Sequence, residues 1–443
     1  MIPEIFNPKS IAIIGATERE NSVGRGIIEN LKSGSAELFY VNPSSKKVFG
    51  EKSYNRITDI EKDIDLAVIA IPKEIVSEGV DDCIEKKVGG VLIVSAGFAE
   101  TGEEGKKRQD EIAEKLSKAG IPLVGPNCLG ILRPPVGLNA SFAPGNPKNG
   151  DICLISQSGA LIDSIIDGAK EENYGFSLII SVGNAAGLSL IDYIKIADED
   201  PSTKVIALYI EGVDKGRELF NCLKKIKTPV VAIKGGKSEK SKKAICSHTG
   251  SLAGEHEIFS AALRQAEVEE VDTLSQLFDV SKALAWQSAT GDRVAVVTNG
   301  GGAGVLLTDQ LYEDGLKLAE LNQDTIEKIE NKMHPDYSKS NPLDIVGDAL
   351  PERYEIAADN FLAQENVDVL VVIMTLQVMT DPLETAKRLV KLKEKHQKPI
   401  LTVFMGAGKE TTEGIDFLEE NKIPNYSHPK RVAKPIKALN NKR

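Results

Sequence analysis

Short runs of consecutive apolar residues recur along the chain, each bounded by polar or turn-forming residues. They are too short for helices, and they are continuous rather than alternating, which is typical of parallel strands buried on both faces of a sheet. The clearest runs are residues 66–71, 91–94, 205–210, 229–233, 367–373 and 399–404. The pattern therefore predicts parallel β-sheets.

Three places share one design, in which an apolar run is followed by a glycine-rich turn and then by a segment with helical spacing. The first passes from residues 10–14 into a turn at Gly15, and helical periodicity resumes at Gly24. The second, at residues 150–159, and the third, at residues 291–302, resemble each other closely. We infer an α/β fold with three units, the last two related by a distant internal duplication.

The stretches between the units indicate the domain boundaries. Residues 133–147 are rich in proline and show little periodicity, so we interpret them as a linker or wrapping loop. Residues 286–291 follow a helix-like segment at 274–284 and mark the second boundary. We therefore expect three domains, which comprise residues 1–130, 131–287 and 288–443.

Composition and charge narrow the class of protein. The apolar fraction of 41% and the charged fraction of 27% are those of a soluble globular protein, and no apolar run is long enough to span a membrane. The N-terminus lacks the basic patch and apolar core of a signal peptide, so we expect a cytoplasmic protein without membrane association. A net charge of −11 argues against a nucleic-acid partner, because binding to the phosphate backbone needs excess Lys and Arg.

The five cysteines are scattered and form no CxxC pair. This pattern argues against a disulfide framework and against a zinc site, and we predict no metal site in this chain. Any anionic ligand must be held by local groups rather than by the overall charge.

Several strand ends of the first unit carry residues suited to a nucleotide. In parallel α/β folds, phosphates bind where a turn at the carboxyl end of a strand exposes N–H groups. The turn at residues 15–26 lacks the GxGxxG spacing of dinucleotide sites but offers the hydroxyls of Thr17 and Ser22 to a pyrophosphate. Taken alone, this turn could equally be an ordinary strand-to-helix connection. The next strand ends lead into residues 41–46, 71–73 and 94–98.

The second unit has a turn suited to an anion and an acidic residue at another strand end. Ser156, Ser158 and Gly159 lie where a strand opens into a helix, whose dipole favours an anion. Ser158 is also suited to cap that helix, and the two roles are compatible. Glu211 directly follows a buried strand, where a carboxylate can orient an imidazole through its second nitrogen. Taken alone, a glutamate in this position is more often a surface residue.

The strongest candidate for chemistry is His248, which lies among small and hydroxyl residues at 246–254. Imidazole titrates near neutrality, so a neutral ring nitrogen can attack phosphorus at cytoplasmic pH. A lone histidine in a Ser/Gly loop is more often simply solvated. Here, however, a long polar segment connects the strand at 229–233 to the helix-like run at 258–263, and such loops are usually functional or disordered. We interpret His248 as a mobile phosphoryl carrier, and we rank His256, which is flanked by two glutamates, below it.

Five motifs occur in the order typical of one enzyme family. They are FNPKSIAIIGA at residues 6–16, GPNCLG at 125–130, ISQSG at 155–159, IEG at 210–212 and SHTGSLAG at 247–254. With them, the chain resembles over nearly its whole length the alpha subunit of the ADP-forming acyl-CoA synthetases (acetate–CoA ligases, ADP-forming), which are related to the succinyl-CoA synthetase alpha subunit. The resemblance implies a Rossmann-like CoA-binding domain followed by two flavodoxin-like domains, the third being specific to the ADP-forming branch.

The resemblance also implies a reaction and assigns residues to it. Acyl-CoA, most simply acetyl-CoA, reacts reversibly with ADP and phosphate to give the acid, CoA and ATP, through an acyl phosphate and a phosphohistidine. His248 matches the phosphorylated residue, and Glu211 matches the residue that steadies the phosphohistidine. The expected phosphate-binding residues are Ser156, Ser158, Gly159 and Gly250. The expected CoA-binding residues are Gly15, Thr17, Ser22, Lys46, Ser95, Ala96, Gly97 and Asn127, with Asn127 near the acyl end.

The same resemblance implies a partner. The sequence holds no ATP-grasp pattern and no length left for one, so ADP or ATP, with Mg²⁺, is expected on a separate ATP-grasp beta subunit. The expected assembly is an alpha2beta2 heterotetramer. This chain alone is expected to be half an enzyme.

The chain departs from the family pattern at three places. Residues 183–187 are GNAAG where GNKAD is usual, Ala303 stands where proline is common, and residues 375–377 are TLQ where TPQ is common. The first change can alter the acid that is accepted or a contact with the partner.

Two alternatives belong to other functional classes. A CoA-sensing regulatory protein, or the CoA-binding part of a protein acetyltransferase, shares the three-domain arrangement but does not need an intact histidine motif. A nicotinamide-dependent oxidoreductase is disfavoured by the missing GxGxxG and by Asn42-Pro43, which stand where an acidic ribose ligand would be expected.

Overall fold

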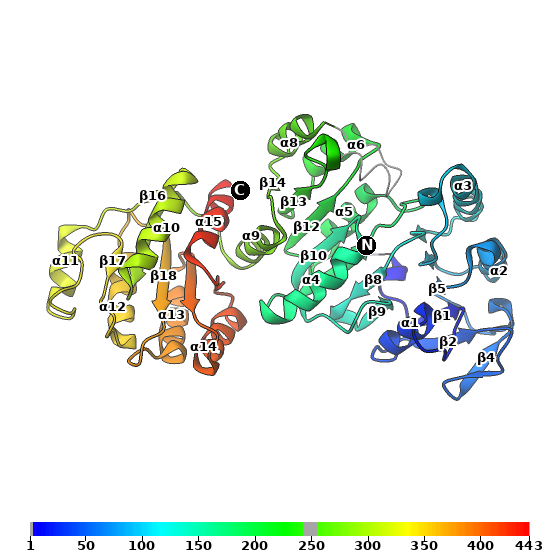
Figure 1. Cartoon of the computed structure of the whole chain (residues 1–443), viewed down its shortest axis with the longest axis horizontal. Coiled ribbons are helices and arrows are strands. Elements are labelled where there is room, and N and C mark those ends of the chain that lie inside the picture. Colours follow the sequence, from blue (N-terminus) through cyan, green and yellow to red (C-terminus); the bar gives the residue numbers. More distant parts are fainter. Residues whose placement is uncertain (1–2, 242–254, 443) are drawn as a thin grey trace. The chain divides into compact units, whose positions relative to one another are not determined.

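The computed structural model describes residues 3–241 and 255–442. The chain forms two compact units, Met1–Asp272 and Thr273–Arg443 (Figure 1). In each unit, buried strands alternate with helices along the chain, as the apolar pattern predicts. None of the helices in the described ranges combines the length and apolar character needed to cross a bilayer.

The first sheet of the N-terminal unit has the strand order of a Rossmann fold. Its strands lie in the order β3-β4-β2-β1-β5-β6-β7 and are parallel except for the β3–β4 hairpin. The order of the parallel strands reverses between β1 and β5, the point at which such sheets bind ligands. The strands are β1 (Ser10–Ile14), β2 (Glu37–Val41), β3 (Lys47–Val48), β4 (Glu51–Tyr54), β5 (Leu66–Ile69), β6 (Val91–Ile93) and β7 (Leu123–Val124). The helices are α1 (Val23–Leu31), α2 (Val76–Lys86) and α3 (Glu103–Lys118).

The second sheet of this unit has a flavodoxin-like parallel core. Its strands lie in the order β14-β13-β12-β10-β11-β8-β9, and the order of the parallel strands reverses between β10 and β12. The parallel strands are β10 (Asn149–Ser156), β11 (Phe176–Ser181), β12 (Val205–Ile210), β13 (Val230–Lys234) and β14 (Glu269–Glu270). The helices are α4 (Gly159–Glu171), α5 (Leu190–Glu199), α6 (Gly216–Leu223) and α8 (His256–Gln265).

The proline-rich stretch that follows the first sheet is more ordered than the predicted linker. Strands β8 (Gly130–Arg133) and β9 (Leu138–Ser141) pair antiparallel with each other, and β8 also pairs antiparallel with β11. All residues of both strands are buried. The interpretation of residues 133–147 as a linker is therefore wrong for its first half. Strands of four residues show too little alternation to be recognised. Of the four prolines that suggested a loop, two lie in the intervening turn, η5 (Pro134–Val136), and the other two follow β9.

One apolar core joins the two sheets of the N-terminal unit. Val68 of the first sheet and Leu208 of the second belong to the same buried cluster. At the edge of this core, the side-chain amide of Asn30 in α1 donates hydrogen bonds of 2.9 Å to the main-chain oxygens of Ser141 and Ala143. The two sheets are therefore held in a defined arrangement within this unit.

The C-terminal unit is a third doubly wound sheet. Its strands lie in the order β16-β15-β18-β19, with β17 also paired to β15, and all pairings are parallel. Helix α15 contacts both α9 and α10, and helices α11 to α14 contact one another in succession, which gives two helix layers (Figure 1). The strands are β15 (Arg293–Thr298), β16 (Lys317–Leu318), β17 (Leu343–Asp344), β18 (Val369–Thr375) and β19 (Ile400–Met405). The helices are α9 (Leu274–Trp286), α10 (Gly301–Glu313), α11 (Gln323–Glu330), α12 (Pro351–Leu362), α13 (Pro382–His396), α14 (Lys409–Glu420) and α15 (Ala433–Asn441).

A buried ion pair links α9 to α14 in the C-terminal unit. Lys282 Nζ lies 2.6 Å from Glu419 Oε1, and the two side chains are 3% and 4% exposed. Lys282 also donates a hydrogen bond of 2.9 Å to the main-chain oxygen of Asn425. Burial raises the pKa of Glu419 even though the Lys282 ammonium acts in the opposite direction. Loss of either partner would leave the other charge buried and uncompensated.

Candidate active site

A large cavity of the N-terminal unit lies at the carboxyl ends of its two sheets. Its volume is about 1460 Å³, and its walls come from the segments that follow β5 and β6 in the first sheet and β10, β11 and β12 in the second. The predicted site residues that line it are Ser95, Ala96, Gly97, Asn127, Ser158, Gly159 and Glu211. The cavity thus lies at the edge where doubly wound sheets bind their ligands.

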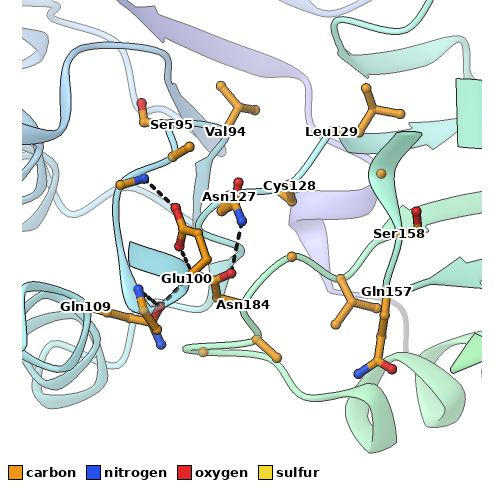
Figure 2. Close-up of a pocket in the computed structure, with 18 of the residues that line it drawn as sticks. Val94, Ser95, Glu100, Gln109, Asn127, Cys128, Leu129, Gln157, Ser158 and Asn184 are labelled. Atoms are coloured by element: carbon orange, nitrogen blue, oxygen red, sulfur yellow. Dashed lines mark hydrogen bonds between the residues drawn. The ribbon is translucent and has the colours of Figure 1, made fainter. Parts of the chain in front are cut away.

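The loop after β6 is shaped by Glu100, which points into it (Figure 2). Glu100 Oε1 accepts hydrogen bonds from the main-chain N–H groups of Gly97 at 2.5 Å and Phe98 at 3.1 Å. Gly97 has a φ of +103°, a backbone conformation that favours glycine. Burial acts to raise the pKa of Glu100, but the hydrogen bonds from Asn184 and from the loop N–H groups outweigh it and lower that pKa. The ionised carboxylate therefore anchors the turn at residues 95–97.

Asn184 connects this loop to the second sheet (Figure 2). It lies in the turn after β11, and its Nδ2 donates to Glu100 Oε2 at 2.6 Å and to Gln109 Oε1 at 2.9 Å. Its Oδ1 accepts a hydrogen bond of 3.2 Å from Asn127 Nδ2. Its main-chain N–H donates to the oxygen of Pro126 at 2.9 Å. One side chain thus ties together α3, the loop before it and the segment after β7.

Helix α4 begins at the cavity wall. Ser158 occupies its N-cap position, but within the described part of the chain the Ser158 hydroxyl makes no capping hydrogen bond. Ser156 is fully buried and shapes the turn, because its hydroxyl donates to the Ser158 oxygen at 2.8 Å and accepts from the Ser158 N–H at 3.1 Å. Uncapped N–H groups together with the helix dipole favour an anion. Ser158 and Gly159 therefore face the cavity, whereas Ser156 lies behind them.

Glu211 follows β12, at the point where the strand order of the second sheet reverses. Gln157 Oε1 accepts hydrogen bonds from the N–H groups of Glu211 at 2.5 Å and Gly212 at 3.1 Å, and Gln157 Nε2 donates to the Gly212 oxygen at 2.9 Å. Glu211 is only 8% exposed, and no described residue donates a hydrogen bond to its Oε2. Burial raises the pKa of the Tyr209 hydroxyl, and the adjacent Glu211 carboxylate raises it further. A buried carboxylate oxygen without a donor is costly, which is typical of a group that receives its partner during function.

The other predicted CoA-binding residues lie on the carboxyl edge of the first sheet but not among the residues that line this cavity. Gly15 has a φ of +97°, and a Cβ there would lie 2.3 Å from a main-chain oxygen after β5, so glycine permits close packing at this point. Thr17 Oγ1 accepts from the N–H of Arg19 at 3.2 Å, and Ser22 Oγ donates to the Arg19 oxygen at 2.6 Å. Lys46 is exposed. CoA binding by these four residues stays a prediction.

The two predicted residues of the histidine segment, His248 and Gly250, lie outside the described residues. The chain leaves β13 at Lys234 and enters α8 at His256. In the parallel pairing of β12 with β13, Lys234 lies opposite Ile210, the residue before Glu211. The segment that carries His248 therefore starts beside the strand end that carries Glu211.

Comparisons with known proteins agree with the order of the three sheets. Residues 9–134 match a family described as a CoA binding domain, residues 149–284 a succinyl-CoA ligase like flavodoxin domain, and residues 294–443 a Ligase-CoA domain. The chain is 40% identical to subunit alpha of acetate–CoA ligase (ADP-forming) II from Pyrococcus furiosus, over 99% of this chain and 97% of that protein. The chain belongs to the ADP-forming acetate–CoA ligases.

Two further relatives of this ligase support the assignment. Acetate–CoA ligase (ADP-forming) I from Archaeoglobus fulgidus is 37% identical over 98% of this chain, although the chain spans only 63% of that longer protein. The solved structure of dinucleotide forming acetyl-coenzyme A synthetase 1 from Ca. Korarchaeum cryptofilum, in complex with phosphate and ADP, is 33% identical and has a TM-score of 0.91 over 98% of this chain and 95% of that chain. The fold class, the family and the enzyme class predicted from the motifs are thus confirmed.

The turn at residues 183–187, which departs from the family pattern, forms part of the cavity wall in this ligase. A Cβ at Gly187 would lie 2.5 Å from the main-chain oxygen of Leu123. Ala185 has a φ of +53°. The aspartate that is usual at position 187 in the family would therefore require a different path for this turn.

The sequence does not predict which side chains hold the cavity wall of this ligase together, although one of them, Asn184, lies in the turn at residues 183–187. Glu100, Gln109 and Asn184 are isolated polar residues that no motif marks as a group. A weak signal exists for Glu100, because a carboxylate three residues after a turn glycine can accept hydrogen bonds from the turn N–H groups. Gln157 lies within the ISQSG motif, but its partner Glu211 is 54 residues away, so the contact depends on strand order.

Proposed function

We propose that this chain is the alpha subunit of a ligase that reversibly converts acetyl-CoA, ADP and phosphate into acetate, CoA and ATP. The observation that supports the proposal is one cavity in which the loop at residues 95–97, the uncapped start of α4 and the carboxylate of Glu211 come together. The reaction needs a CoA site, a phosphate site and a partner for an imidazole. The loop, the helix start and the Glu211 carboxylate can provide them in that order.

The first half-reaction joins phosphate to the acyl group. CoA binds along the carboxyl edge of the first sheet, at the residues predicted for it, with its thioester towards Asn127. Phosphate binds the N–H groups at the start of α4, with Ser158 and Gly159, and a phosphate oxygen attacks the thioester carbonyl carbon. The C–S bond breaks, the CoA thiolate leaves and an acyl phosphate forms. Asn184 orients the Asn127 amide for this step through their hydrogen bond.

The second half-reaction moves the phosphoryl group to His248. A neutral ring nitrogen attacks phosphorus, the P–O bond to the acyl oxygen breaks, and the acid leaves as its carboxylate. Glu211 Oε2 accepts a hydrogen bond from the other ring nitrogen and stabilises the charge on the phosphorylated ring. An oxygen of the ADP β-phosphate then attacks the same phosphorus, which gives ATP and restores the imidazole.

The nucleotide half of the reaction belongs to a partner. The Pyrococcus relative is named as a subunit alpha, and the Archaeoglobus relative is longer than this chain. We infer that an ATP-grasp beta subunit binds ADP or ATP with Mg²⁺, and that the two subunits form an alpha2beta2 heterotetramer. The bound metal would offset the negative charge of the nucleotide phosphates.

The proposal is tested by combining the chain with an ATP-grasp beta subunit, acetyl-CoA and radiolabelled phosphate. We expect acid-labile, base-stable label on this chain, and its transfer to ADP when ADP is added. Isothermal titration of the chain alone should show that it binds CoA and not NAD. CoA binding without label under any of these conditions would favour the CoA-sensing alternative, and preference for NAD would favour the oxidoreductase.

The Glu211→Gln variant should accumulate phosphohistidine roughly 10- to 100-fold more slowly than wild type, because the neutral amide stabilises a charged ring less well. The initial rate of labelling measures this effect. Asp214→Asn is the matched control, since Asp214 lines the same cavity from the same loop but is exposed. Unchanged labelling of Glu211→Gln would reduce Glu211 to a structural role.

The Asn184→Asp variant should weaken CoA binding about tenfold at pH 8, because it places a second carboxylate 2.6 Å from Glu100 Oε2. Like charges at this distance raise the pKa of the pair, so protonation at lower pH should restore part of the affinity. Calorimetric titration of CoA at pH 8 and pH 6 measures both effects. An affinity equal to wild type at both pH values would show that this contact does not shape the CoA site.

A further inference from the structure

Lys234 is a buried lysine to which the proposed chemistry assigns no role. It is the last residue of β13 and is only 2% exposed. Its Nζ donates hydrogen bonds to the main-chain oxygens of Glu211 at 2.8 Å and Gly235 at 2.5 Å. Removing an ammonium group from water is costly, and lysine is rarely this buried. A compensating role is therefore expected.

Lys234 and Gln157 hold the main chain of Glu211 from two sides. Gln157 accepts hydrogen bonds from the N–H groups of Glu211 and Gly212, while Lys234 donates to the Glu211 oxygen. The Glu211 Oε2 atom, in contrast, has no donor among the described residues. The backbone of this glutamate is thus fixed in place while one carboxylate oxygen stays available, which is the arrangement of a preorganised acceptor.

The internal duplication provides a comparison within the same chain. In the C-terminal unit, Thr298 Oγ1 donates to the Gly300 oxygen at 3.0 Å and accepts from the Gly300 N–H at 3.1 Å. Ser156 makes the same two hydrogen bonds with Ser158. The turns after β10 and β15 are therefore equivalent residue by residue.

The side-chain amide at the middle of each turn, Gln157 or Asn299, is also equivalent. Asn299 Oδ1 accepts from the Thr375 N–H at 2.7 Å, and Asn299 Nδ2 donates to the Thr375 oxygen at 2.9 Å. Gln157 accepts from the N–H of Glu211 in the same way. Thr375 therefore corresponds to Glu211. In both units, a side-chain amide in the turn accepts a hydrogen bond from the main-chain N–H of this residue.

In contrast, the N-terminal unit has a lysine, Lys234, at a position where the C-terminal unit has a phenylalanine, Phe404. Lys234 lies opposite Ile210 across the β12–β13 pair, and Phe404 lies opposite Met374, the residue before Thr375, across the β18–β19 pair. Phe404 is buried, at 1% exposure. The fold can thus fill this position with an apolar side chain, and the lysine occurs in the unit that carries the glutamate.

We propose that Lys234 is a positioning residue for phosphoryl transfer, which acts by holding Glu211 and by placing a buried positive charge beside it. This inference rests on the proposed role of Glu211. The ammonium binds the main-chain oxygen, so it leaves the carboxylate free to accept from the imidazole. Its positive charge adds an electrostatic attraction to the Glu211 side chain.

The test is a double-mutant cycle of Lys234→Met and Glu211→Gln in the assembled complex, with the initial rate of chain labelling by radiolabelled ATP as the readout. We expect Lys234→Met to slow labelling roughly 10- to 100-fold in the wild-type background. In the Glu211→Gln background the same change should alter the rate less than about twofold, because the residue through which Lys234 acts is already disabled. The affinity for CoA should be unchanged in every variant.

Two further variants keep the result interpretable. Lys237→Met is the matched control, because Lys237 lies three residues away, its side chain is 41% exposed and it pairs with Asp272. We expect this variant to label like wild type. Lys234→Gln retains a donor for the Glu211 oxygen but has no charge. We expect it to label at a rate between wild type and Lys234→Met, and it replaces Lys234→Met in the cycle if that variant unfolds.

The possible failures are distinguishable. Suppose that Glu211→Gln slows labelling. If the Lys234 variant then labels at the wild-type rate, or slows labelling by the same factor in both backgrounds, Lys234 has no positioning role. The proposed function stands in either case. Wild-type labelling of Glu211→Gln overturns the roles of both residues. Absence of label on the wild-type chain overturns the proposed phosphoryl carrier itself.

Discussion

In the His248→Asn variant we expect no phosphoenzyme, and we expect turnover of the assembled ligase to fall by at least about 10³-fold. Asparagine keeps hydrogen-bonding capacity, but it has no ring nitrogen that can attack phosphorus. Affinity for CoA should be unchanged, because the loop at residues 95–97 belongs to the first sheet, whereas the histidine segment follows β13 of the second. Radiolabel on the chain measures the phosphoenzyme, coupled ATP formation measures turnover, and calorimetric titration measures the affinity for CoA.

The control for this prediction is His256→Asn. His256 is the first residue of α8, and it is flanked by Glu255 and Glu257, which would repel a phosphate. We expect this variant to be labelled and to turn over like wild type. Equal labelling of His248→Asn and wild type would show that the phosphoryl group is carried elsewhere, and loss of label only in His256→Asn would identify the carrier as the second histidine.

The Lys282→Met variant should destabilise the C-terminal unit by about 3–5 kcal/mol, because it leaves the Glu419 carboxylate buried without its partner. Burial already raises the pKa of Glu419, and loss of the ammonium should raise it further. A carboxyl whose pKa is higher in the folded than in the unfolded state binds more protons when folded, so stability falls as pH rises through the folded pKa. The deficit should therefore be largest at alkaline pH and should shrink towards pH 5.

Trp286 allows this effect to be measured in the whole chain. It is the only tryptophan of the sequence, it lies at the end of α9, and its ring is 5.8 Å from Lys282 Nζ. Denaturant unfolding followed by tryptophan fluorescence therefore reports on the C-terminal unit. In the Lys282→Met, Glu419→Leu double variant we expect most of the stability to return, since no buried charge remains. A single variant as stable as wild type at pH 8 would contradict the prediction.

Much of the fold could be predicted because it depends on local patterns. The apolar runs at residues 66–71, 205–210 and 229–233 correspond to β5, β12 and β13, since a strand covered on both faces by helices must be apolar at successive positions. The similarity of residues 150–159 to 291–302 extends to matching hydrogen bonds in the two turns. The short antiparallel strands β8 and β9 escaped prediction, because their pairing partners are supplied by the rest of the sheet.

The candidate site could be predicted only in part. Ser158, Gly159 and Glu211 could be predicted because they lie at strand ends, where parallel α/β sheets bind their ligands. The three residues do line one cavity. The contacts that hold the wall together could not be foreseen. Glu100 and Asn184 are 84 residues apart, and they meet because the edges of two different sheets face each other.

The sequence by itself determined the α/β class, the ligase family and the chemical candidates, because strand patterns and motifs are properties of short segments. Only the tertiary structure decided what Lys234 does. In the sequence it directly follows the apolar run at residues 229–233 and begins a long polar segment, and no motif indicates that it is buried. In the fold, the parallel pairing of β12 with β13 places Lys234 beside Glu211, where it is buried and donates a hydrogen bond to the Glu211 main-chain oxygen. Burial and hydrogen-bond partners depend on strand order, which no single segment encodes.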